Sequence, residues 1–208
     1  MIKEHLGHRI DGWVHTLFPF LFWRRLDPDL LTVIGTVIAG SAGWAYAEGA
    51  LVLGGCLLWA GGFFDLVDGV VARHHGISTR FGAFLDSSLD RVVDILALLG
   101  LAIHFTRIEE PSGVVLCAVI LVASVLTSYA KARAELMIDR MPGGMLERGE
   151  RIGLLIVGSL FGLIWPVLWI LAIGASVTVG QRFLYARREM ARLDRVDRAR
   201  ERNTTAPG

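Results

Sequence analysis

The sequence predicts an all-α polytopic membrane protein with six transmembrane helices, preceded by an N-terminal amphipathic helix at the membrane interface. Hydrophobic residues make up 53% of the 208 residues. The mean hydropathy is +0.53, which is too apolar for an ordinary soluble domain. The apolar residues gather in runs separated by short polar connections, and the basic residues fall mostly on one side of the path that these runs describe. These observations favour a single membrane domain, and nothing in the composition indicates a nucleic-acid partner.

Residues 1–26 predict an amphipathic juxtamembrane helix. Apolar residues recur there at helical spacing among charged ones, and Trp13 and Phe18 are residue types that settle at the level of the lipid headgroups. Pro19 is expected to kink or end this helix. A helix packed on the protein's own flank is the alternative. The charged first half of the segment argues against a cleavable signal peptide.

Residues 27–188 are expected to form the membrane domain, with a helix start at Asp27-Pro28-Asp29. The six apolar segments cover residues 30–46, 51–64, 81–105, 114–129, 152–164 and 167–179. The second segment continues to Arg73, and a tight turn at Trp165-Pro166 separates the last two. Several runs are shorter than the roughly 20 residues that cross a bilayer. Residues 189–208 predict a charged cytoplasmic tail that is helical up to Arg202.

The one-sided distribution of charge predicts the topology. The basic residues of one side are Arg24, Arg25, Arg73, Arg80, Lys131, Arg133, Arg140, Arg148, Arg151, Arg182, Arg187 and Arg188. The opposite side carries Arg107 together with Glu48, Glu109 and Glu110. The positive-inside rule therefore predicts a multi-pass protein of the plasma (inner) membrane with both termini in the cytoplasm.

Four aspartates lie at the cytoplasmic edge of two predicted helices. Asp65 and Asp68 share one face of the first helix, and Asp86 and Asp90 share one face of the next. Ionised groups at membrane depth are costly, and four facing carboxylates repel each other unless cations hold them together. Oxygen ligands favour Mg²⁺, Mn²⁺ or Ca²⁺ over zinc or copper. The alternative is a salt-bridge network with Arg73, Arg80 and Arg91.

These aspartates belong to a longer pattern, Asp65-x2-Asp68-Gly69-x2-Ala72-Arg73-x8-Gly82-x3-Asp86-x3-Asp90. The pattern resembles, without a departure, the signature of the CDP-alcohol phosphotransferase family. Eight positions at fixed spacing over 26 residues make a specific signal. The resemblance implies six spans, a cytoplasmic active site and a homodimer. It also implies an enzyme of phospholipid biosynthesis that transfers a phosphatidyl group from CDP-diacylglycerol to an alcohol and releases CMP.

The resemblance also implies a role for each residue. Asp65, Asp68, Asp86 and Asp90 look like ligands of Mg²⁺ or Mn²⁺, two ions per active site, and Asp90 also looks like the general base. Residues that look like the CDP-lipid site are Asp29, Leu30, Leu31, Thr32, Gly69, Ala72, Arg73, Thr79 and Gly82. Glycine lets a ligand approach the backbone closely, and an arginine suits a diphosphate.

The acceptor alcohol is predicted from a set of basic residues, Lys131, Arg133, Arg148, Arg151 and Arg182. Their segments resemble those of phosphatidylinositol-phosphate synthases and related bacterial members, in which such residues bind the acceptor's phosphate. The alternative is that they serve only as topology charges. Guanidinium and ammonium groups suit phosphate, and a neutral acceptor does not need them. We therefore expect a phosphorylated polyol, with inositol phosphate ahead of glycerol 3-phosphate.

Two other classes of function compete with the enzyme. A divalent-cation transporter needs acidic residues near the middle of several spans, whereas these aspartates lie at one end of two helices. An inactive membrane scaffold is expected to lose the motif, which is intact. Cys56 and Cys117 lie in apolar runs without metal-site spacing and predict buried free thiols.

Overall fold

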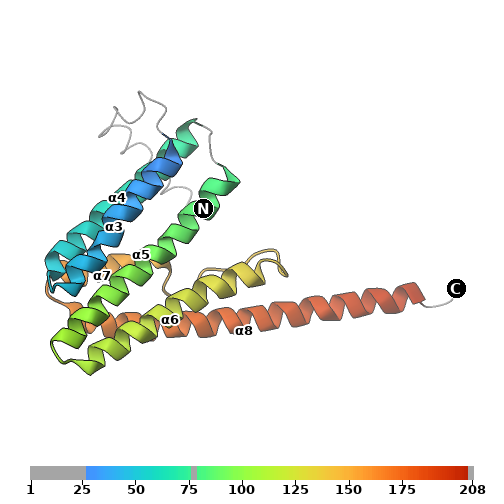
Figure 1. The fold of residues 1–208 in the computed structure, drawn as a ribbon. Helices are drawn as coiled ribbons and strands as arrows, with labels where there is room; N and C mark the ends of the chain where they lie inside the picture. The colour runs from blue at the N-terminus through green and yellow to red at the C-terminus, as the bar shows by residue number, and fades with distance from the viewer. Residues whose placement is uncertain (1–26, 76–78, 206–208) are drawn as a thin grey trace.

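The computed structural model describes residues 27–75 and 79–205, and the side chains of all of these except 72–75 and 199–205. This part of the chain forms six α-helices: α3 (Pro28–Ala47), α4 (Leu51–His75), α5 (Arg80–Arg107), α6 (Pro111–Ala134), α7 (Arg148–Leu160) and α8 (Ile164–Thr205) (Figure 1). The all-helical prediction is therefore confirmed for the described chain. The amphipathic helix predicted for residues 1–26 lies outside the described residues.

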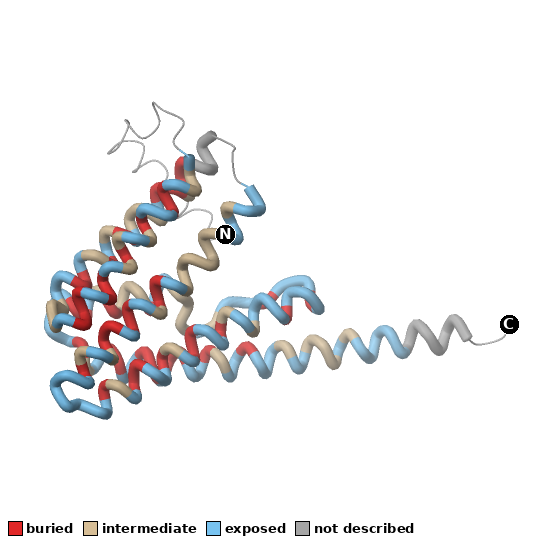
Figure 2. Tube along the Cα trace, viewed as in Figure 1, coloured by how far each residue is buried: buried red, intermediate tan, exposed pale blue. Residues whose placement is uncertain are grey.

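The helices pack around one main core. Helix α3 lies beside α4 and α5, and α6 packs against α5 and α8, while α7 contacts α4 and α8 (Figure 1). The largest side chains of this core are Tyr46, Leu58, Leu101, Phe105 and Leu168, all almost fully buried. Buried residues follow the helix contacts, and the outer faces are exposed (Figure 2). The core thus holds together α4, α5 and α7, the helices that carry most of the predicted site residues.

Four of the described helices are long and apolar enough to cross a membrane: α3, α6, the Leu51–Val71 part of α4 and the Ile164–Arg198 part of α8. Their outer faces carry large apolar side chains such as Val37, Trp44 and Ile173, each at least 60% exposed. Helix α7, with 13 residues, is too short by this criterion. Helix α5 is long enough but carries four charged residues within three turns, from Asp86 to Asp94. Length and composition therefore support four of the six predicted spans.

The two cysteines differ in exposure. Cys117 is buried, as predicted, but the same prediction is wrong for Cys56, which is exposed on α4. An apolar run in a membrane helix includes positions that face lipid, so apolar neighbours in the sequence do not ensure burial inside the protein.

The start of α3 follows the local sequence signals. The Asp27 side chain accepts a hydrogen bond from the backbone N–H of Asp29 at 3.0 Å. Pro28 occupies the first turn, where its missing N–H removes no helical hydrogen bond. The predicted helix start at Asp27-Pro28-Asp29 is confirmed.

The predicted turn at Trp165-Pro166 is wrong. Helix α7 ends at Leu160 and α8 begins at Ile164, so Pro166 lies in the first turn of α8. A proline is tolerated there because the first N–H groups of a helix have no partner within the helix. The break instead contains Gly162, with a φ of 69° that glycine adopts without a steric cost. Residues assigned to the end of the fifth predicted span therefore belong to this turn and to α8.

Helices α3 and α5 approach each other most closely at two glycines. A Cβ atom on Gly100 would lie 2.7 Å from the carbonyl carbon of Gly43 and closer still to its oxygen. A Cβ on Gly43 would lie 2.5 Å from the carbonyl oxygen of Leu96. Because the neighbours in these contacts are backbone atoms, they cannot move aside as a side chain can. The approach of α3 to α5 therefore depends on the absence of a side chain at both positions.

Replacing Gly100 by alanine is expected to destabilise the protein by about 1–3 kcal/mol, the usual cost of overpacking a core. The melting temperature of the detergent-solubilised protein would fall by roughly 2–4 °C per kcal/mol. Gly180→Ala is the matched control, because a Cβ on Gly180 meets nothing within 4 Å. That variant should melt at or above the native temperature, since alanine is the better helix former. Equal melting temperatures for the two variants would contradict the close approach.

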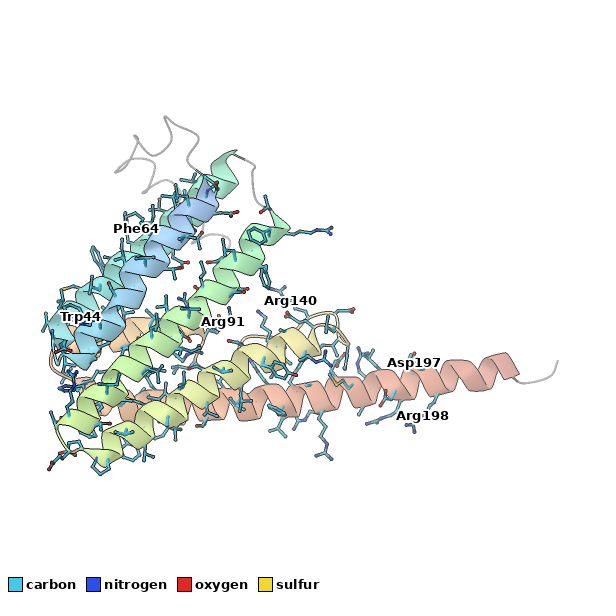
Figure 3. The ribbon with its side chains drawn as sticks, in the orientation of Figure 1. Trp44, Phe64, Arg91, Arg140, Asp197 and Arg198 are labelled. Atoms are coloured by element: carbon cyan, nitrogen blue, oxygen red, sulfur yellow. The ribbon has the colours of Figure 1, made fainter. Side chains whose placement is uncertain are left out.

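Helix α8 continues to Thr205, beyond the helix end expected at Arg202. It extends well past the other helices (Figure 1). A small apolar cluster holds the turn that follows α6 against it, formed by Ala134, Ile138 and Met141 with Ala186, Met190 and Leu193. Past this cluster α8 is largely exposed, and Asp197 and Arg198 lie on the projecting part (Figures 2 and 3).

Candidate functional site

Three carboxylates from two helices meet at one point. Asp65 and Asp68 lie on α4 and Asp86 lies on α5, and one oxygen from each falls within 4.8 Å of the others. Asp68 is buried, while Asp65 and Asp86 are half-buried. A donor set made of oxygen alone favours hard divalent cations such as Mg²⁺ and Mn²⁺. The structure therefore brings three of the four predicted metal ligands together in a group that could hold such a cation.

Helix α3 orients the most buried of these carboxylates. The Thr32 hydroxyl lies within hydrogen-bond distance of Oδ2 of Asp68 and of the Pro28 carbonyl oxygen, the latter at 3.0 Å. Thr32 is itself only 8% exposed. A charged acceptor binds a hydroxyl more strongly than a carbonyl does, so the Thr32 proton is best used on Asp68. Thr32, which the sequence assigned to the CDP-lipid site, is thus also a support for a predicted metal ligand.

The amino ends of α3 and α5 meet at Gly82. Thr79 caps α5 by accepting a hydrogen bond from the Gly82 N–H at 2.8 Å. A Cβ atom on Gly82 would lie 2.8 Å from Oδ1 of Asp29 and 3.1 Å from Oγ1 of Thr79. The structure thus brings together three residues predicted for the CDP-lipid site, and the missing side chain at Gly82 makes this possible.

The other residues predicted for that site are distributed differently. Leu31 is buried in a small core with Val67, Val70 and Val71, and Leu30 is 57% exposed. Gly69 is half-buried next to Asp68. Ala72 and Arg73 belong to the last turn of α4, and their side chains lie outside the described residues.

Asp90 lies one turn from Asp86 along α5 and pairs with an arginine of α7. Nη1 of Arg148 lies 2.8 Å from Oδ1 of Asp90 and 3.9 Å from Oδ2 of Asp65. Arg148 therefore joins the fourth predicted ligand to the group of three carboxylates. The Arg148 guanidinium lies closer to Asp90 than to Asp65, so Asp90 is the carboxylate of the four that it pairs with most closely.

Asp94 lies one further turn along α5 and contacts two arginines. Nη2 of Arg151 lies 3.3 Å from Oδ2 of Asp94, and Nε of Arg148 lies 3.5 Å from Oδ1. The sequence suggested Arg73, Arg80 and Arg91 as the alternative partners of the acidic residues. Among the described side chains the cations paired with this acidic face come from α7 instead. The signal that could have found them is the i, i+3 spacing of Arg148 and Arg151, matched to the i, i+4 spacing of Asp90 and Asp94.

Arg182 lies in a second basic region. It is 7% exposed, and its Nη1 donates a hydrogen bond to the Thr127 carbonyl oxygen at 2.6 Å. It lines an open pocket of about 520 Å³ with Gln181, Tyr185 and residues 141–145. Lys131 and Arg133 lie on the last turn of α6 and are exposed. Five residues were predicted to bind the acceptor phosphate. Arg148 and Arg151 both contact Asp94, Arg182 lines a separate pocket, and Lys131 and Arg133 are exposed on α6.

A cavity leads from the acidic group into the helix bundle. Its polar end is formed by Thr32, Asp65, Asp90 and Arg148. The other walls come from small and apolar residues of α3, α4, α5 and α7, namely Gly35, Thr36, Ala39, Leu58, Gly61, Gly62, Val93 and Ile152. A reacting group in this cavity could therefore reach both Asp90 and Asp65.

The fold and the site together define a helical membrane protein with a carboxylate site suited to divalent cations. Residues 25–180 match the family described as CDP-alcohol phosphatidyltransferase. The chain belongs to this family, which is an enzyme family.

Two relatives illustrate the similarity. The chain is 36% identical over 176 residues to the phosphatidylinositol phosphate synthase of Mycobacteroides abscessus, covering 80% of each chain. It is 38% identical over 167 residues to the archaetidylinositol phosphate synthase of Methanothermobacter thermautotrophicus, covering 77% of this chain and 83% of that one.

Solved structures agree with the sequence comparison. The phosphatidylinositol phosphate synthase of Mycobacterium tuberculosis with CDP-DAG bound has a TM-score of 0.72 and 30% sequence identity, over 88% of this chain and 94% of that one. A second structure of that protein, in complex with manganese and citrate, has a TM-score of 0.68 at 31% identity, over 86% of this chain and 88% of that one.

Proposed function

We propose that the protein transfers the phosphatidyl group of CDP-diacylglycerol to a phosphorylated polyol, inositol phosphate, and releases CMP. The observation that carries the proposal is the three-carboxylate group of Asp65, Asp68 and Asp86, which Arg148 joins to Asp90. An acidic group next to guanidinium groups suits a reaction between two phosphate-bearing substrates. The names of the relatives described above support the choice of acceptor.

The donor set fits Mg²⁺ or Mn²⁺. All the candidate ligand atoms are carboxylate oxygens, and those of Asp65, Asp68 and Asp86 are close enough to share a cation. Two such ions in one site would neutralise a diphosphate and polarise the reacting phosphorus. Thr32 would keep Asp68 oriented for this role through its hydrogen bond. The manganese complex of the Mycobacterium tuberculosis protein supports the same ion class.

Asp90 is assigned as the general base and as a further metal ligand. Its carboxylate would take the proton of the acceptor hydroxyl while that oxygen forms a bond to the phosphorus of the phosphatidyl group. The bond from this phosphorus to the bridging oxygen of the diphosphate breaks, and CMP leaves with that oxygen. The cavity shared by Asp65, Asp90 and Arg148 supports this assignment.

The donor substrate would lie along the amino ends of α3 and α5. Asp29, Thr79 and Gly82 meet there, one turn from Asp86. The nucleotide would use the backbone at Gly69 and Gly82, and Arg73 would bind the diphosphate. The remaining members of this proposed site are Leu30, Leu31, Thr32 and Ala72.

The acceptor's phosphate would bind the basic residues on the α7 side of the cavity. Arg148 and Arg151 are the primary candidates, because they lie beside Asp90 and because guanidinium groups bind phosphate through two donors at once. The buried Arg182 has an Nε without a hydrogen-bond partner among the described atoms, which supports a role in anion binding. Lys131 and Arg133 are exposed and would contact the acceptor's phosphate from the edge of its binding site.

The membrane arrangement completes the proposal. Residues 1–26 would form an interfacial helix, residues 27–188 six spans and residues 189–208 a cytoplasmic tail. The positive-inside rule supports an active site and two termini on the cytoplasmic face of the plasma membrane. A homodimer is proposed from family resemblance, and the exposed apolar faces of the helices are compatible with it.

The reaction is tested by CMP release from CDP-diacylglycerol with the purified protein and Mn²⁺ or Mg²⁺. Inositol 1-phosphate, glycerol 3-phosphate, free inositol and serine are offered separately. We expect turnover with inositol 1-phosphate, little with glycerol 3-phosphate and only background with the two unphosphorylated alcohols. Turnover with free inositol or serine alone would contradict the basic acceptor pocket. Turnover with glycerol 3-phosphate alone would replace the acceptor and keep the pocket.

A further inference from the structure

Asp94 is a buried carboxylate that the proposed reaction does not use. It lies outside the eight-position motif, one turn beyond Asp90 on α5, and is 8% exposed. Oδ2 lies 3.3 Å from Nη2 of Arg151, and Oδ1 lies 3.5 Å from Nε of Arg148. A buried ionised group is retained at little cost only when it is paired. Asp94 therefore forms a hydrogen bond with Arg151 and a longer ion pair with Arg148, in which neither Oδ1 of Asp94 nor Nε of Arg148 has a hydrogen-bond partner among the described atoms.

The two arginines need this partner because of their position on α7. Both lie in its first turn, where the helix dipole is positive and repels cations. Arg151 is also buried, at 5% exposed, and its Nη1 donates to the Leu146 carbonyl oxygen at 3.2 Å. Asp94 supplies the carboxylate paired with Arg151, and Asp94 and Asp90 together hold the guanidinium of Arg148 facing α5.

Arg148 lies between Asp94 and Asp90. Its Nε edge faces Asp94, and its Nη1 lies 2.8 Å from Asp90. The guanidinium is rigid and planar, so fixing one edge fixes the direction of the other donors. The position of Asp94 therefore determines whether the donors of Arg148 point at Asp90 or into the cavity that Asp90 and Arg148 line.

We propose that Asp94 is a positioning residue for the acceptor substrate: it holds Arg148 and Arg151 in the orientation that receives the acceptor's phosphate. It also keeps Arg148 from pairing with Asp90 alone. The inference rests on the proposed function, because the phosphate belongs to the acceptor. Asp94 acts only through the two arginines and touches no reacting atom.

A positioning role and a purely electrostatic role of Asp94 predict changes of opposite sign in the affinity for the acceptor when Asp94 is replaced. If Asp94 acted only through its charge, removing that charge would leave two unneutralised arginines and strengthen the binding of an anionic acceptor. If Asp94 positions the arginines, its removal lets Arg151 turn away and leaves Arg148 bound to Asp90 and Asp65. Acceptor binding then weakens. A divalent cation also binds less well, because Arg148 competes for the same carboxylates.

Asp94→Asn tests this, since asparagine keeps the size of the side chain but replaces one of the two oxygens by an NH2 group, so one of the two arginines faces a donor instead of an acceptor. We expect the KM for the phosphorylated acceptor to rise roughly 10- to 100-fold, as for a lost charge-assisted hydrogen bond. The KM for CDP-diacylglycerol should stay within about twofold of native. The Kd for Mn²⁺, measured by electron paramagnetic resonance without substrates, should rise by about tenfold, the lower end of the range for the loss of an outer partner of a metal ligand.

Ser159→Ala is the matched control. Ser159 is equally buried on α7, about 12 Å along the helix from Arg151, and hydrogen-bonds the Tyr46 hydroxyl at 2.8 Å. It should lower the melting temperature and leave both KM values and the Mn²⁺ affinity native. An acceptor KM that stays native or falls in Asp94→Asn would overturn the proposal.

Two further measurements cover the cases in which Asp94→Asn does not fold or the native protein is inactive. If Asp94→Asn yields no folded protein, Asp94→Glu decides, because it retains the charge and moves it by one methylene. The proposal expects the acceptor KM to rise in that variant as well, and a native KM would overturn it. If the native protein releases no CMP with any phosphorylated acceptor, the proposed function fails. The role of Asp94 is then judged by the Mn²⁺ affinity of Asp94→Glu, which retains the charge, and an unchanged Kd in that variant would overturn it.

Discussion

Asp90→Asn is expected to lower kcat for CMP release by about 10² to 10⁴-fold, the range that a positioned general base contributes. Asparagine retains an oxygen that accepts from Arg148, which lies 2.8 Å from Asp90, so the packing of α7 against α5 should survive. The KM for CDP-diacylglycerol should change little, because the donor-side residues Asp29, Thr79 and Gly82 lie at another end of the site. Steady-state kinetics with inositol 1-phosphate measure both constants.

Asp139→Asn is the control for this substitution. It makes the same chemical change at an exposed position beyond the end of α6. Its kcat should equal the native value. A kcat for Asp90→Asn within about threefold of native would exclude Asp90 as the base and leave its ion pair with Arg148 and its proposed role as a metal ligand.

Asp68→Asn is expected to weaken Mn²⁺ binding by more than about 100-fold, since losing an outer hydrogen-bond partner of a metal ligand already costs 10- to 100-fold. The asparagine can still accept from Thr32, so α3 and α4 should remain packed. Activity should fall as the Mn²⁺ occupancy of the site falls, and it should recover in part at high Mn²⁺ concentration. Titration of the protein with Mn²⁺, followed by electron paramagnetic resonance, measures the affinity directly.

Thr32→Val tests the hydrogen bond from Thr32 to Asp68 without changing the metal ligand Asp68 itself. It removes the hydrogen bond to Asp68 and keeps the side-chain volume, so the loss of Mn²⁺ affinity should be smaller, about 10- to 100-fold. Equal, native affinities in Asp68→Asn and Thr32→Val would contradict a cation site formed by Asp65, Asp68 and Asp86.

Four of the described helices, α3, α4, α6 and α8, were predictable because they contain long apolar runs. The start of α3 was also predictable, because Asp27 and Pro28 act locally through a cap and a fixed dihedral angle. The turn between α7 and α8 was predicted at the proline. The turn forms at Gly162 instead. A proline does not disturb the first turn of a helix, whereas Gly162 adopts a left-handed backbone conformation that a helix does not contain. The local signal was therefore sufficient at the start of α3 and misleading at the start of α8.

The acidic half of the site was predictable because its spacing lies within two consecutive helices. Asp65 and Asp68 on α4 meet Asp86 on α5 because α3 packs against both helices. The pairing of Asp94 with Arg151 spans 57 residues and depends on how α7 packs, and no short motif encodes this. The same limit applies to Arg182, whose buried contact with Thr127 joins α8 to α6 across 55 residues.

The length of α8 has a consequence for the part of the protein that lies outside the bilayer. A helix of 42 residues is about 63 Å long at 1.5 Å per residue. The hydrocarbon core is only about 30 Å thick. No tilt within the usual range of roughly 0–40° brings the whole helix into lipid. Between about a third and a half of α8 must therefore lie outside the hydrocarbon core as a helical rod, which carries exposed local contacts such as the pair of Glu189 with Arg192. Raising the salt concentration should loosen this rod first, because screening weakens exposed pairs and leaves the apolar contacts of the bundle intact.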